Sequence, residues 1–395
     1  MLSIAANRTY QYRIYPTVKQ IIALTMMLRD HCDLYNAARA ERIAAWRHSS
    51  KTSIRFYDQC AQLKDIRATD ERQRRWSAWS QQQTLRRLDR SFAAFFRRCT
   101  AGLTYGFPRF KFYDRFNTVT FDGEHGAWRE SDRRVRVQGV GHIKVKLHRP
   151  TKGTVKQFSI TRRGKKWYVN VICVDVPAES RQPTGAVIGL DRGVTNLLAD
   201  SDDGFTPNPR HTRNAQVRLA NAQRDLSRCR RGSNRRRKVV ARVANLHEKV
   251  AATRKDHLHK LSRSLVDDYD VIVLEDLRIA NMVRKPKLKP DPGSPGEYLP
   301  NGAAAKGGLN KAIQDAGWGM LAEMIRYKAE SAGTEVMFVP PHWTSQTCHA
   351  CGHVAAENRV KEAFKCLACG HSAHADTNAA KNILRLGLSL RDPSG

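Results

Sequence analysis

Four cysteines near the C-terminal end of the chain have the residue type and spacing of a metal site. They form two pairs, Cys348 with Cys351 and Cys366 with Cys369, and fourteen residues separate the pairs. Four thiolates at this spacing can close a tetrahedral site around Zn²⁺, which leaves no open position for catalysis. The segment 345–372 is too short and polar to fold without a metal. We therefore expect a structural zinc site there.

Three carboxylates lie where a hydrolytic metal site could form. Asp191 follows the apolar run AVIGL and Glu275 follows the run VIVL, so each is expected at the end of a buried strand. Asp376 opens DTNAAKNIL, which has the signals of a helix start. Two strand ends and a helix start can bring the three carboxylates together around one or two Mg²⁺ ions. Such ions would activate water for phosphodiester hydrolysis.

Each carboxylate taken alone has a simpler interpretation. Asp191 could cap a turn, Glu275 could pair with an arginine, and Asp376 could cap its helix. Three carboxylates in matching contexts on a strongly basic chain favour the metal site, and Asp276, on the other face of its strand, is a weaker candidate. His374 could reach a scissile phosphate or hold the nearby Asp376. The chain has no phosphate-binding loop, nucleophile elbow or HExxH motif to indicate another chemistry.

The composition indicates a polyanionic partner. Of the 395 residues, 69 are Lys or Arg and 37 are Asp or Glu, which gives a formal net charge of +32 at pH 7. So large an excess is self-repulsive, and nucleic acid is the economical partner. No stretch of about 20 apolar residues is present to span a membrane. The N-terminus lacks the apolar core of a signal peptide, so we expect a cytoplasmic protein.

The hydrophobic pattern changes twice along the chain. Residues 1–15 alternate as a strand, residues 17–100 have helical periodicity, and residues 105–180 return to strands, with a hairpin turning at Arg163-Gly164. After the linker Pro183-Thr184-Gly185, strands alternate with helices, which indicates an α/β layer. That part comprises strands at 186–193, 266–277 and 334–341, long helices over 211–265 broken at 228–238, a helix over 316–333, and a mobile loop at 285–308.

A helix at the end of the first helical region carries a candidate nucleic-acid surface. Aromatic, amide and guanidinium groups share one face, a mixture suited to stacking on bases and binding phosphates. A basic helix with two packed tryptophans explains the same pattern. The expected apolar stripe is Leu85, Leu88, Phe92, Phe96 and Cys99. The opposite face is Trp76, Trp79, Gln83, Arg86, Arg87, Arg90 and Arg97.

Several motifs resemble those of the TnpB family, transposon-encoded RNA-guided endonucleases related to the type V CRISPR effectors. The motifs are LDRGVTNLLA, VIVLEDL, the knuckles TSQTCHACGH and FKCLACG, HADTNAAKNIL, and also GFPRFK (106–111) and DAGWG (315–319). The resemblance covers nearly the whole chain, although GFPRFK alone would not be specific. It implies that Asp191, Glu275 and Asp376 are the three metal-binding catalytic residues.

The resemblance also implies a multidomain α+β architecture. Residues 1–15 and 105–182 would form a β-barrel-like wedge domain that binds oligonucleotides, with a helical recognition domain inserted at 16–104. Residues 183–344 and 373–395 would form a RuvC-like α/β nuclease domain with the RNase H fold. Residues 345–372 would insert into it a zinc-ribbon module that binds target nucleic acid.

The implied partners are a guide RNA from the transposon end and the double-stranded DNA that the guide pairs with. A short duplex motif beside the target would be read by the stretches that hold Tyr57, Trp79 and Gln82. The basic run 228–238, with Arg230 and Arg235, would contact the guide or the heteroduplex. A flexible basic loop without a fixed partner explains this run equally well.

These observations favour Mg²⁺-dependent, RNA-guided DNA cleavage in a prokaryotic host. An RNA-guided DNA-binding repressor with an idle nuclease fold is a second hypothesis, which the intact carboxylates disfavour. A transposase that joins DNA ends is a third, and the chain lacks a recognisable tyrosine–histidine pairing of single-strand transposases.

Overall fold

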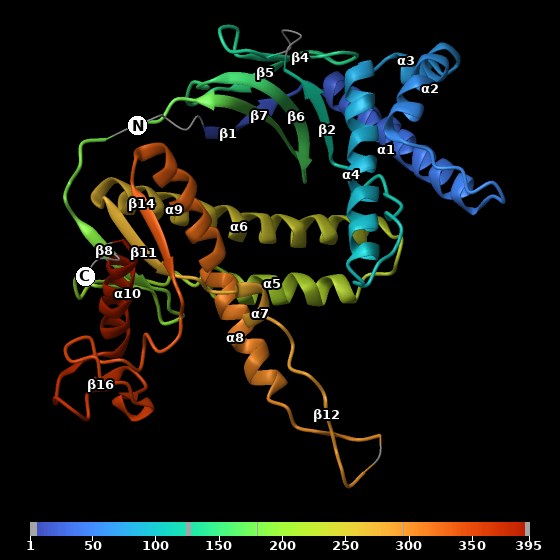
Figure 1. Ribbon diagram of the computed structural model, residues 1–395. Helices are drawn as coiled ribbons and strands as arrows, with labels where there is room; N and C mark the ends of the chain where they lie inside the picture. The colour runs from blue at the N-terminus through green and yellow to red at the C-terminus, as the bar shows by residue number, and fades with distance from the viewer. Residues whose placement is uncertain (1–5, 124–127, 180, 295, 392–395) are drawn as a thin grey trace. The chain divides into compact units, whose positions relative to one another are not determined.

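The chain divides into two compact units, Met1–Pro177 and Ala178–Gly395 (Figure 1). The structure, a computed structural model, describes residues 6–123, 128–179, 181–294 and 296–391. The expected first strand over 1–15 is therefore described from residue 6 onward. Arg181 belongs to the second unit, because its Nε donates to the Val266 carbonyl (2.8 Å) and its guanidinium pairs with Asp270 (2.8 Å). The second unit thus begins before the Pro183-Thr184-Gly185 turn.

The first unit is built on a seven-stranded antiparallel sheet. The strand order is β2-β6-β7-β1-β5-β4-β3. The β6–β7 hairpin confirms the turn expected at Arg163-Gly164, since Arg163 lies opposite Lys166. No ladder joins the outer strands β2 and β3 among the described residues, so the expected barrel-like closure is not seen there and stays a prediction. The strands are β1 (Ala6–Tyr15), β2 (Thr118–Asp122), β3 (Trp128–Arg129), β4 (Arg134–Val137), β5 (Gly141–Lys146), β6 (Thr154–Arg163) and β7 (Lys166–Val176).

Four helices follow β1 in the sequence and share a hydrophobic core with the sheet. A capping box starts the first helix, because Thr17 Oγ1 accepts from the Gln20 N–H and Gln20 Oε1 accepts from the Thr17 N–H. Tyr12 and Phe158 from the sheet and Leu24 and Leu85 from the helices belong to one buried cluster. The helices are α1 (Val18–Arg47), α2 (Phe56–Thr69), α3 (Glu71–Arg74) and α4 (Ala78–Thr100).

The second unit is built on a five-stranded mixed sheet in the order β10-β9-β8-β11-β14. Strand β11 is parallel to both of its neighbours, β8 and β14, whereas β9 pairs antiparallel with β8 and β10 pairs antiparallel with β9. All five residues of β11 are buried, as expected for a parallel strand covered on both faces. The strands are β8 (Val187–Asp191), β9 (Asn196–Asp200), β10 (Phe205–Pro207), β11 (Val271–Glu275) and β14 (Glu335–Val339).

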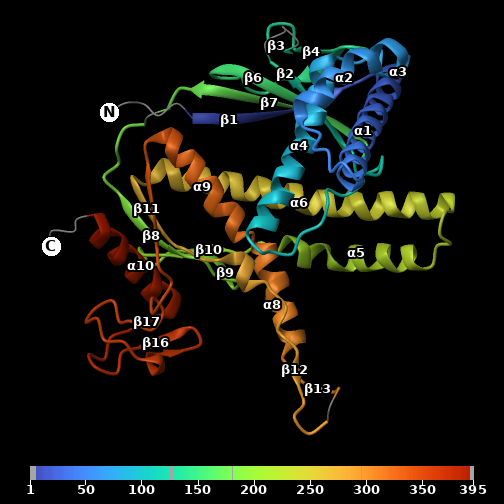
Figure 2. The same cartoon turned by 45° about the vertical axis from the view of Figure 1, so that its right-hand side comes forward.

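Helices cover both faces of this sheet (Figure 2). Alternate residues of β11 face opposite sides: Ile272 and Leu274 pack with the core of α6, α8 and α9, whereas Val271 and Val273 pack with Ile383 of α10. The expected long helices over 211–265 with a break at 228–238 are confirmed by α5 and α6. The helices are α5 (His211–Ser227), α6 (Asn234–Asp268), α7 (Ile279–Met282), α8 (Ala303–Ala316), α9 (Trp318–Ala332) and α10 (Ala375–Arg391).

Two glycines allow α10 to lie directly on the sheet. A Cβ added to Gly189 of β8 would collide with the Ala380 carbonyl oxygen of α10. A Cβ added to Gly387 of α10 would lie 2.6 Å from the Val273 side chain of β11. Contacts this close require the absence of a side chain at both positions. This packing fixes the first turn of α10 beside the ends of β8 and β11.

Two expectations about local structure need correction. The segment 285–308 is not wholly a loop, because β12 (Lys289–Pro290) pairs with β13 (Tyr298–Leu299) and α8 begins at Ala303. Phe96 is 56% exposed and does not belong to the buried stripe of α4. Phe95 takes that place, because its ring packs on Phe107 with centroids 4.9 Å apart.

Candidate active site and zinc centre

Asp191 and Glu275 end neighbouring parallel strands. In the β8–β11 ladder Leu190 lies opposite Leu274, so the next residue of each strand reaches the same edge of the sheet. Carboxyl ends of parallel strands are where α/β sheets present functional groups. Glu275 is 8% exposed, and Asp191 is partly buried. The apolar runs that precede them in the sequence therefore place two carboxylates side by side.

Asp376 joins them from the first turn of α10. Its backbone N–H donates to Nδ1 of His374 at 3.2 Å, so this imidazole caps the helix start rather than holding the carboxylate. The His374 ring also meets Phe205 edge to face, with centroids 4.8 Å apart. One of the two roles expected for His374, contact with the Asp376 carboxylate, is therefore not seen.

The three carboxylates interact electrostatically. Burial, followed by the negative charges of Glu275 and Asp376, raises the pKa of Asp191 to about 7. Burial also raises the pKa of Glu275 above its usual range. Burial is the largest cause for both groups, and the nearby arginines offset it only in part. The grouped carboxylates therefore favour the binding of a cation.

Thr344 and Arg192 hold Glu275. The Thr344 hydroxyl donates to Glu275 Oε1 at 2.7 Å, and the Arg192 guanidinium donates to the Glu275 backbone carbonyl. Arg192 is 6% exposed, and its Nε has no hydrogen-bond partner in the described part of the chain. A buried guanidinium N–H without a partner is costly unless another acceptor approaches. A phosphate oxygen is an acceptor of the right charge.

Arg359 reaches Asp376 from the cysteine-rich segment. Its Nη2 lies 2.8 Å from Asp376 Oδ1. The segment folds as a small sheet of β15 (Arg359–Val360), β16 (Ala363–Lys365) and β17 (Ser372–His374). The sequence reasoning missed both contacts. Thr344 opens the motif TSQTCHACGH and Arg359 is one of three basic residues between the two cysteine pairs, but neither position indicates a contact with a carboxylate.

The four cysteines form a site of the size that Zn²⁺ requires. In the described part of the chain, theirs is the one group of at least three Cys, His or acidic residues whose ligand atoms all lie within 4.8 Å. The Sγ atoms of Cys348 and Cys369 are 3.7 Å apart, and those of Cys351 and Cys366 are 3.5 Å apart. Sulfurs about 2.3 Å from a tetrahedral zinc lie about 3.8 Å from one another. The cysteines therefore fit zinc, whereas the carboxylates form a looser group, which suits an ion that retains water ligands.

Each cysteine pair is held in the same backbone turn. Cys348 N–H donates to the His353 carbonyl and Cys366 N–H to the His371 carbonyl. A glycine with positive φ closes each turn, Gly352 at 79° and Gly370 at 70°. The Cys369 N–H also points at the Cys366 sulfur, and this hydrogen bond lowers the pKa of the Cys366 thiol. This turn thus favours the thiolate form of Cys366, the form that binds metal.

Two buried asparagines of α10 fasten the cysteine module beside the carboxylates. Asn378 Nδ2 donates to the Thr347 carbonyl at 2.7 Å, and its Oδ1 accepts from the His349 N–H at 3.0 Å. Asn382 Nδ2 donates to the carbonyls of Thr344 and Thr347. The zinc module is therefore coupled to the helix that carries Asp376.

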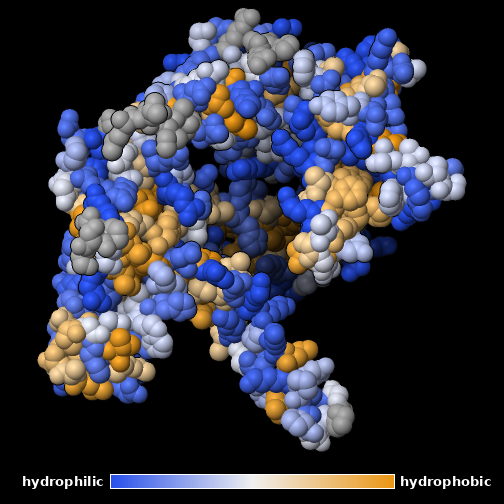
Figure 3. All heavy atoms as spheres, viewed as in Figure 1, coloured by the Kyte–Doolittle hydropathy of each residue, from blue (hydrophilic) through white to orange (hydrophobic). Residues whose placement is uncertain are grey.

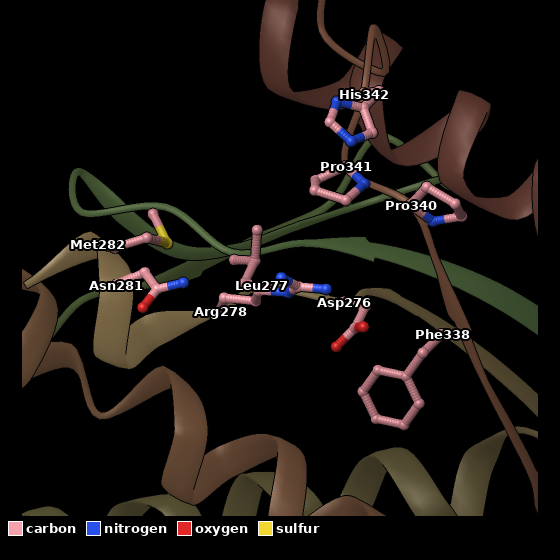
Figure 4. Close-up of a pocket in the computed structure, with 9 residues that line it drawn as sticks. All are labelled: Asp276, Leu277, Arg278, Asn281, Met282, Phe338, Pro340, Pro341 and His342. Atoms are coloured by element: carbon pink, nitrogen blue, oxygen red, sulfur yellow. The ribbon is translucent and has the colours of Figure 1, made fainter. Parts of the chain in front are cut away.

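A pocket of about 690 Å³ opens next to Glu275 (Figure 4). Asp276 follows β11, and Figure 4 shows it between Phe338 on one side and the run Pro340, Pro341 and His342 on the other. Arg278, Asn281, Leu277 and Met282 complete the lining. The lining includes Asp276 but not Glu275, as expected if the two side chains face opposite ways. The pocket combines apolar surface with polar groups.

The residues expected to bind nucleic acid differ in exposure and fall into three groups. Trp76 was wrongly placed on the exposed face: α4 begins at Ala78, and Trp76 is fully buried with its Nε1–H donating to Asp30 Oδ2 at 2.7 Å. The helical period does not extend back to Trp76, and a buried indole N–H requires an acceptor. Gln82 and Gln83 are half-buried. The exposed group is Tyr57, Trp79, Arg86, Arg90, Arg230 and Arg235.

Two protein-family models match parts of the chain that contain the candidate site. A family model described as "Probable transposase" (OrfB_IS605) matches residues 171–285, which include Asp191 and Glu275. A second model, described as "Cas12f1-like, TNB domain", matches residues 318–383, which include the four cysteines and Asp376. Thus the two models between them contain both halves of the candidate site.

Two curated relatives and one solved structure resemble most of the chain. InsQ of Escherichia coli (strain K12), provisionally named an RNA-guided DNA endonuclease, is 34% identical over 312 residues, 78% of this chain and 74% of InsQ. A Streptomyces pristinaespiralis protein with the same provisional name is 29% identical and covers 97% of this chain and 90% of that protein. The structure of the mini-RNA-guided endonuclease CRISPR-Cas_phi3 shares the fold, with a TM-score of 0.51, 10% identity, and coverage of 97% of this chain and 92% of that chain.

The fold, the three carboxylates and the cysteine module together define a nuclease-like α/β protein with an attached metal module. The chain belongs to the TnpB family, the family of InsQ. Among the described residues, no helix combines the length and apolarity needed to cross a bilayer.

Proposed function

We propose that the protein is a transposon-encoded, RNA-guided DNA endonuclease. The observation that carries the proposal is that Asp191 and Glu275 end neighbouring parallel strands and Asp376 lies in the first turn of α10. Burial, followed by the two acidic neighbours, raises the pKa of Asp191 to about 7. The names of InsQ and the Streptomyces relative support the same activity. The repressor hypothesis is less favoured, because a chain that only binds DNA has no need for three mutually repelling carboxylates with little exposure to water.

We assign Mg²⁺ to the carboxylates in a RuvC-like reaction. Bound Mg²⁺ would activate water and stabilise the leaving oxygen during phosphodiester hydrolysis. Thr344 orients Glu275 through its hydroxyl, and Arg359 holds the Asp376 carboxylate in place. Arg192, with an unpaired Nε–H, is placed to donate to a phosphate oxygen of the substrate strand. Asp191 would be fully ionised once a divalent cation neutralises the cluster.

We assign structural Zn²⁺ to Cys348, Cys351, Cys366 and Cys369. Its role is to keep the small β15–β17 sheet folded, since that segment buries very few apolar side chains. Through Asn378 and Arg359, the folded module fixes both the backbone and the carboxylate of the first turn of α10.

The proposed partners are a guide RNA and double-stranded target DNA. The first unit would combine the helical recognition domain (16–104) with the wedge domain, whose expected bounds of 1–15 and 105–182 run past the end of this unit at Pro177. The exposed Tyr57, Trp79, Arg86 and Arg90 would contact nucleic acid there. The second unit would contain the nuclease domain (183–344 and 373–395) and the zinc ribbon (345–372). The excess of Lys and Arg over Asp and Glu supports a polyanionic partner, and the family's cellular setting suggests action in the bacterial cytoplasm.

The test compares the parent protein with Asp191→Ala on a target that matches the copurifying RNA. We expect the parent to cut and Asp191→Ala to bind the target without cutting. Asp256→Ala makes the same change at an exposed position of α6 and should cut normally. Cleavage by Asp191→Ala would contradict the catalytic assignment. Target binding without cleavage by the parent would favour a repressor, and RNA-independent joining of transposon ends would favour a transposase.

A further inference from the structure

The segment 103–113 exposes an unusual number of large apolar side chains. Tyr105 is 64% exposed, Phe110 53% and Phe112 61%, and Phe96 at the end of α4 is 56% exposed. Figure 3 shows an apolar area over this end of α4 and the chain that follows it. Isolated exposed apolar side chains are common, but a cluster of aromatic rings marks a contact surface.

This segment has no regular secondary structure, yet its backbone is fixed on α1. Asn36 pairs with Lys111 much as a neighbouring strand would: its Oδ1 accepts from the Lys111 N–H at 2.9 Å, and its Nδ2 donates to the Lys111 carbonyl at 2.8 Å. The Arg39 guanidinium donates to the Pro108 carbonyl, and the Tyr113 hydroxyl donates to Asp33 Oδ1 at 2.7 Å. The exposed rings are therefore held in place by a tethered backbone.

The rings form two groups. Phe110 and Phe112 lie two residues apart in the sequence, and their ring centroids are 5.4 Å apart in an edge-to-face arrangement. Phe95 is buried and supports the second group, with Tyr105 edge-on at 5.9 Å and Phe107 stacked at 4.9 Å. Each group leaves aromatic surface open to solvent while its backing is packed.

Basic residues alternate with these rings. Arg109 lies before Phe110, Lys111 lies between Phe110 and Phe112, and Arg115 follows, whereas Asp114 is the one acidic residue of the segment 103–115. A protein partner for an apolar patch has no need of a positive border. Aromatic faces within a positive border fit the bases and phosphates of an unpaired nucleic-acid strand.

We propose that the aromatic side chains of segment 103–113, together with Phe96, form a stacking platform for unpaired bases of the guide RNA. The inference rests on the proposed function, which supplies the RNA. RNA fits better than DNA for a physical reason: a stable RNA partner covers the exposed rings throughout the protein's working life, whereas target DNA would cover them only briefly. Bases in loops and single-stranded parts of a folded RNA are splayed out and open to stacking.

The test measures affinity for the copurifying RNA, transcribed in vitro and labelled, over a range of salt concentrations. All titrations use protein that also carries Asp191→Ala, so the result does not depend on cleavage. Phe110→Ala/Phe112→Ala should weaken binding by roughly five- to 150-fold for each base that loses its stack. The slope of log K against log salt should not change, because no phosphate contact is removed. Arg109→Gln should instead lower that slope by about one.

Substitutions that keep or remove the ring separate stacking from general apolar contact. Phe110→Tyr/Phe112→Tyr should retain affinity, and Phe110→Leu/Phe112→Leu should lose it. Tyr298→Ala, which removes a 58% exposed ring in the β12–β13 hairpin, is the matched control and should bind normally. Equal binding by the leucine and tyrosine pairs would overturn the platform. So would a loss confined to single-stranded DNA of the same sequence, or an equal loss on a fully paired RNA duplex. Failure of the parent to bind the RNA at all would instead contradict the proposed function.

Discussion

At the scale of single residues, the carboxylate of Asp191 is the most informative group in the protein. Burial and its two acidic neighbours raise its pKa to about 7, even though Arg192 and Arg359 lie near enough to oppose the shift. Folding has therefore brought together negative charges that the protein itself leaves incompletely neutralised. Such an arrangement destabilises the metal-free fold and becomes favourable when a divalent cation binds.

Mg²⁺ should therefore stabilise the folded protein through this cluster. We expect its addition to raise the thermal unfolding midpoint of the second unit, by an amount equivalent to about 2.7 kcal/mol at an ion concentration of 100 times Kd. Asp191→Asn should unfold at a higher temperature than the parent without Mg²⁺ and should respond much less to the ion. Differential scanning calorimetry measures both effects, and Asp256→Asn is the control. An equal Mg²⁺ response in Asp191→Asn would contradict the assignment of the ion.

The buried His31 side chain leads us to expect that the first unit loses folding stability in acid. Its ring is fully buried, with Nδ1 donating to the Met27 carbonyl and Nε2 2.9 Å from Ser80 Oγ, and burial lowers its pKa from 6.5 to about 4. Because the folded state favours the neutral ring, the stabilisation is complete above pH 6.5 and is lost as the pH falls toward 4. The loss should approach about 3 kcal/mol.

Chemical denaturation between pH 7 and pH 4 tests this expectation. His31→Gln, which cannot take up a proton, should show a smaller loss of stability over that range than the parent. His48→Gln changes an exposed histidine in the same unit and should keep the parent's pH dependence. If His31→Gln lost stability as steeply as the parent, the acid sensitivity would have another origin.

At the scale of elements, the sequence was sufficient to locate the strands that present Asp191 and Glu275. Short, wholly apolar runs that end in a carboxylate have few other interpretations in an α/β chain. The contacts of Thr344 and Arg359 could not be predicted, because they depend on how the zinc module folds back on α10. The prediction that Trp76 lies on the exposed face of the helix was wrong, because helical periodicity does not reveal where a helix begins. Phe95 is buried in place of Phe96 because it packs on Phe107, which lies outside the helix, so the helical pattern alone could not identify the buried ring.

The close packing of α10 on the sheet predicts that Gly189→Ala is damaging. The added methyl group would meet the backbone of α10, which must shift and carry Asp376 away from Asp191. We expect a loss of about 1–3 kcal/mol in stability together with a fall in cleavage. Gly307→Ala makes the same change in α8, where nothing lies within 4 Å of the added carbon, and should be neutral or slightly stabilising. Normal stability and cleavage in Gly189→Ala would show that α10 is not held so tightly.

Removal of zinc should abolish cleavage, because the zinc module holds α10 in place. Cys351→Ser should lower the zinc content and unfold the β15–β17 sheet, which releases Arg359 and Asn378 from their positions around α10. We expect loss of cleavage, measured alongside zinc content by atomic emission. Cys99→Ser, a half-buried cysteine outside the site, should keep both. Full cleavage by a zinc-free protein would contradict the structural role of the module.

At the scale of the whole molecule, the large positive net charge indicates a polyanionic partner. The formal charge of +32 is spread over a chain whose first unit exposes aromatic and basic side chains and whose second unit carries the three carboxylates. Charge of this size accounts for affinity for nucleic acid but not for the choice of a sequence. For an RNA-guided nuclease, that choice comes from base pairing between guide RNA and target.

The most direct measurement is therefore to change the guide. The copurifying RNA would be sequenced, its target-pairing segment replaced by an unrelated sequence, and the reassembled protein incubated with Mg²⁺ and DNA that contains either the old or the new target. We expect the cut to move to the new target, next to the same short duplex motif, and to disappear with Asp191→Ala. Cleavage that stays at the old site, or that proceeds without any RNA, would contradict RNA-guided cleavage by this protein.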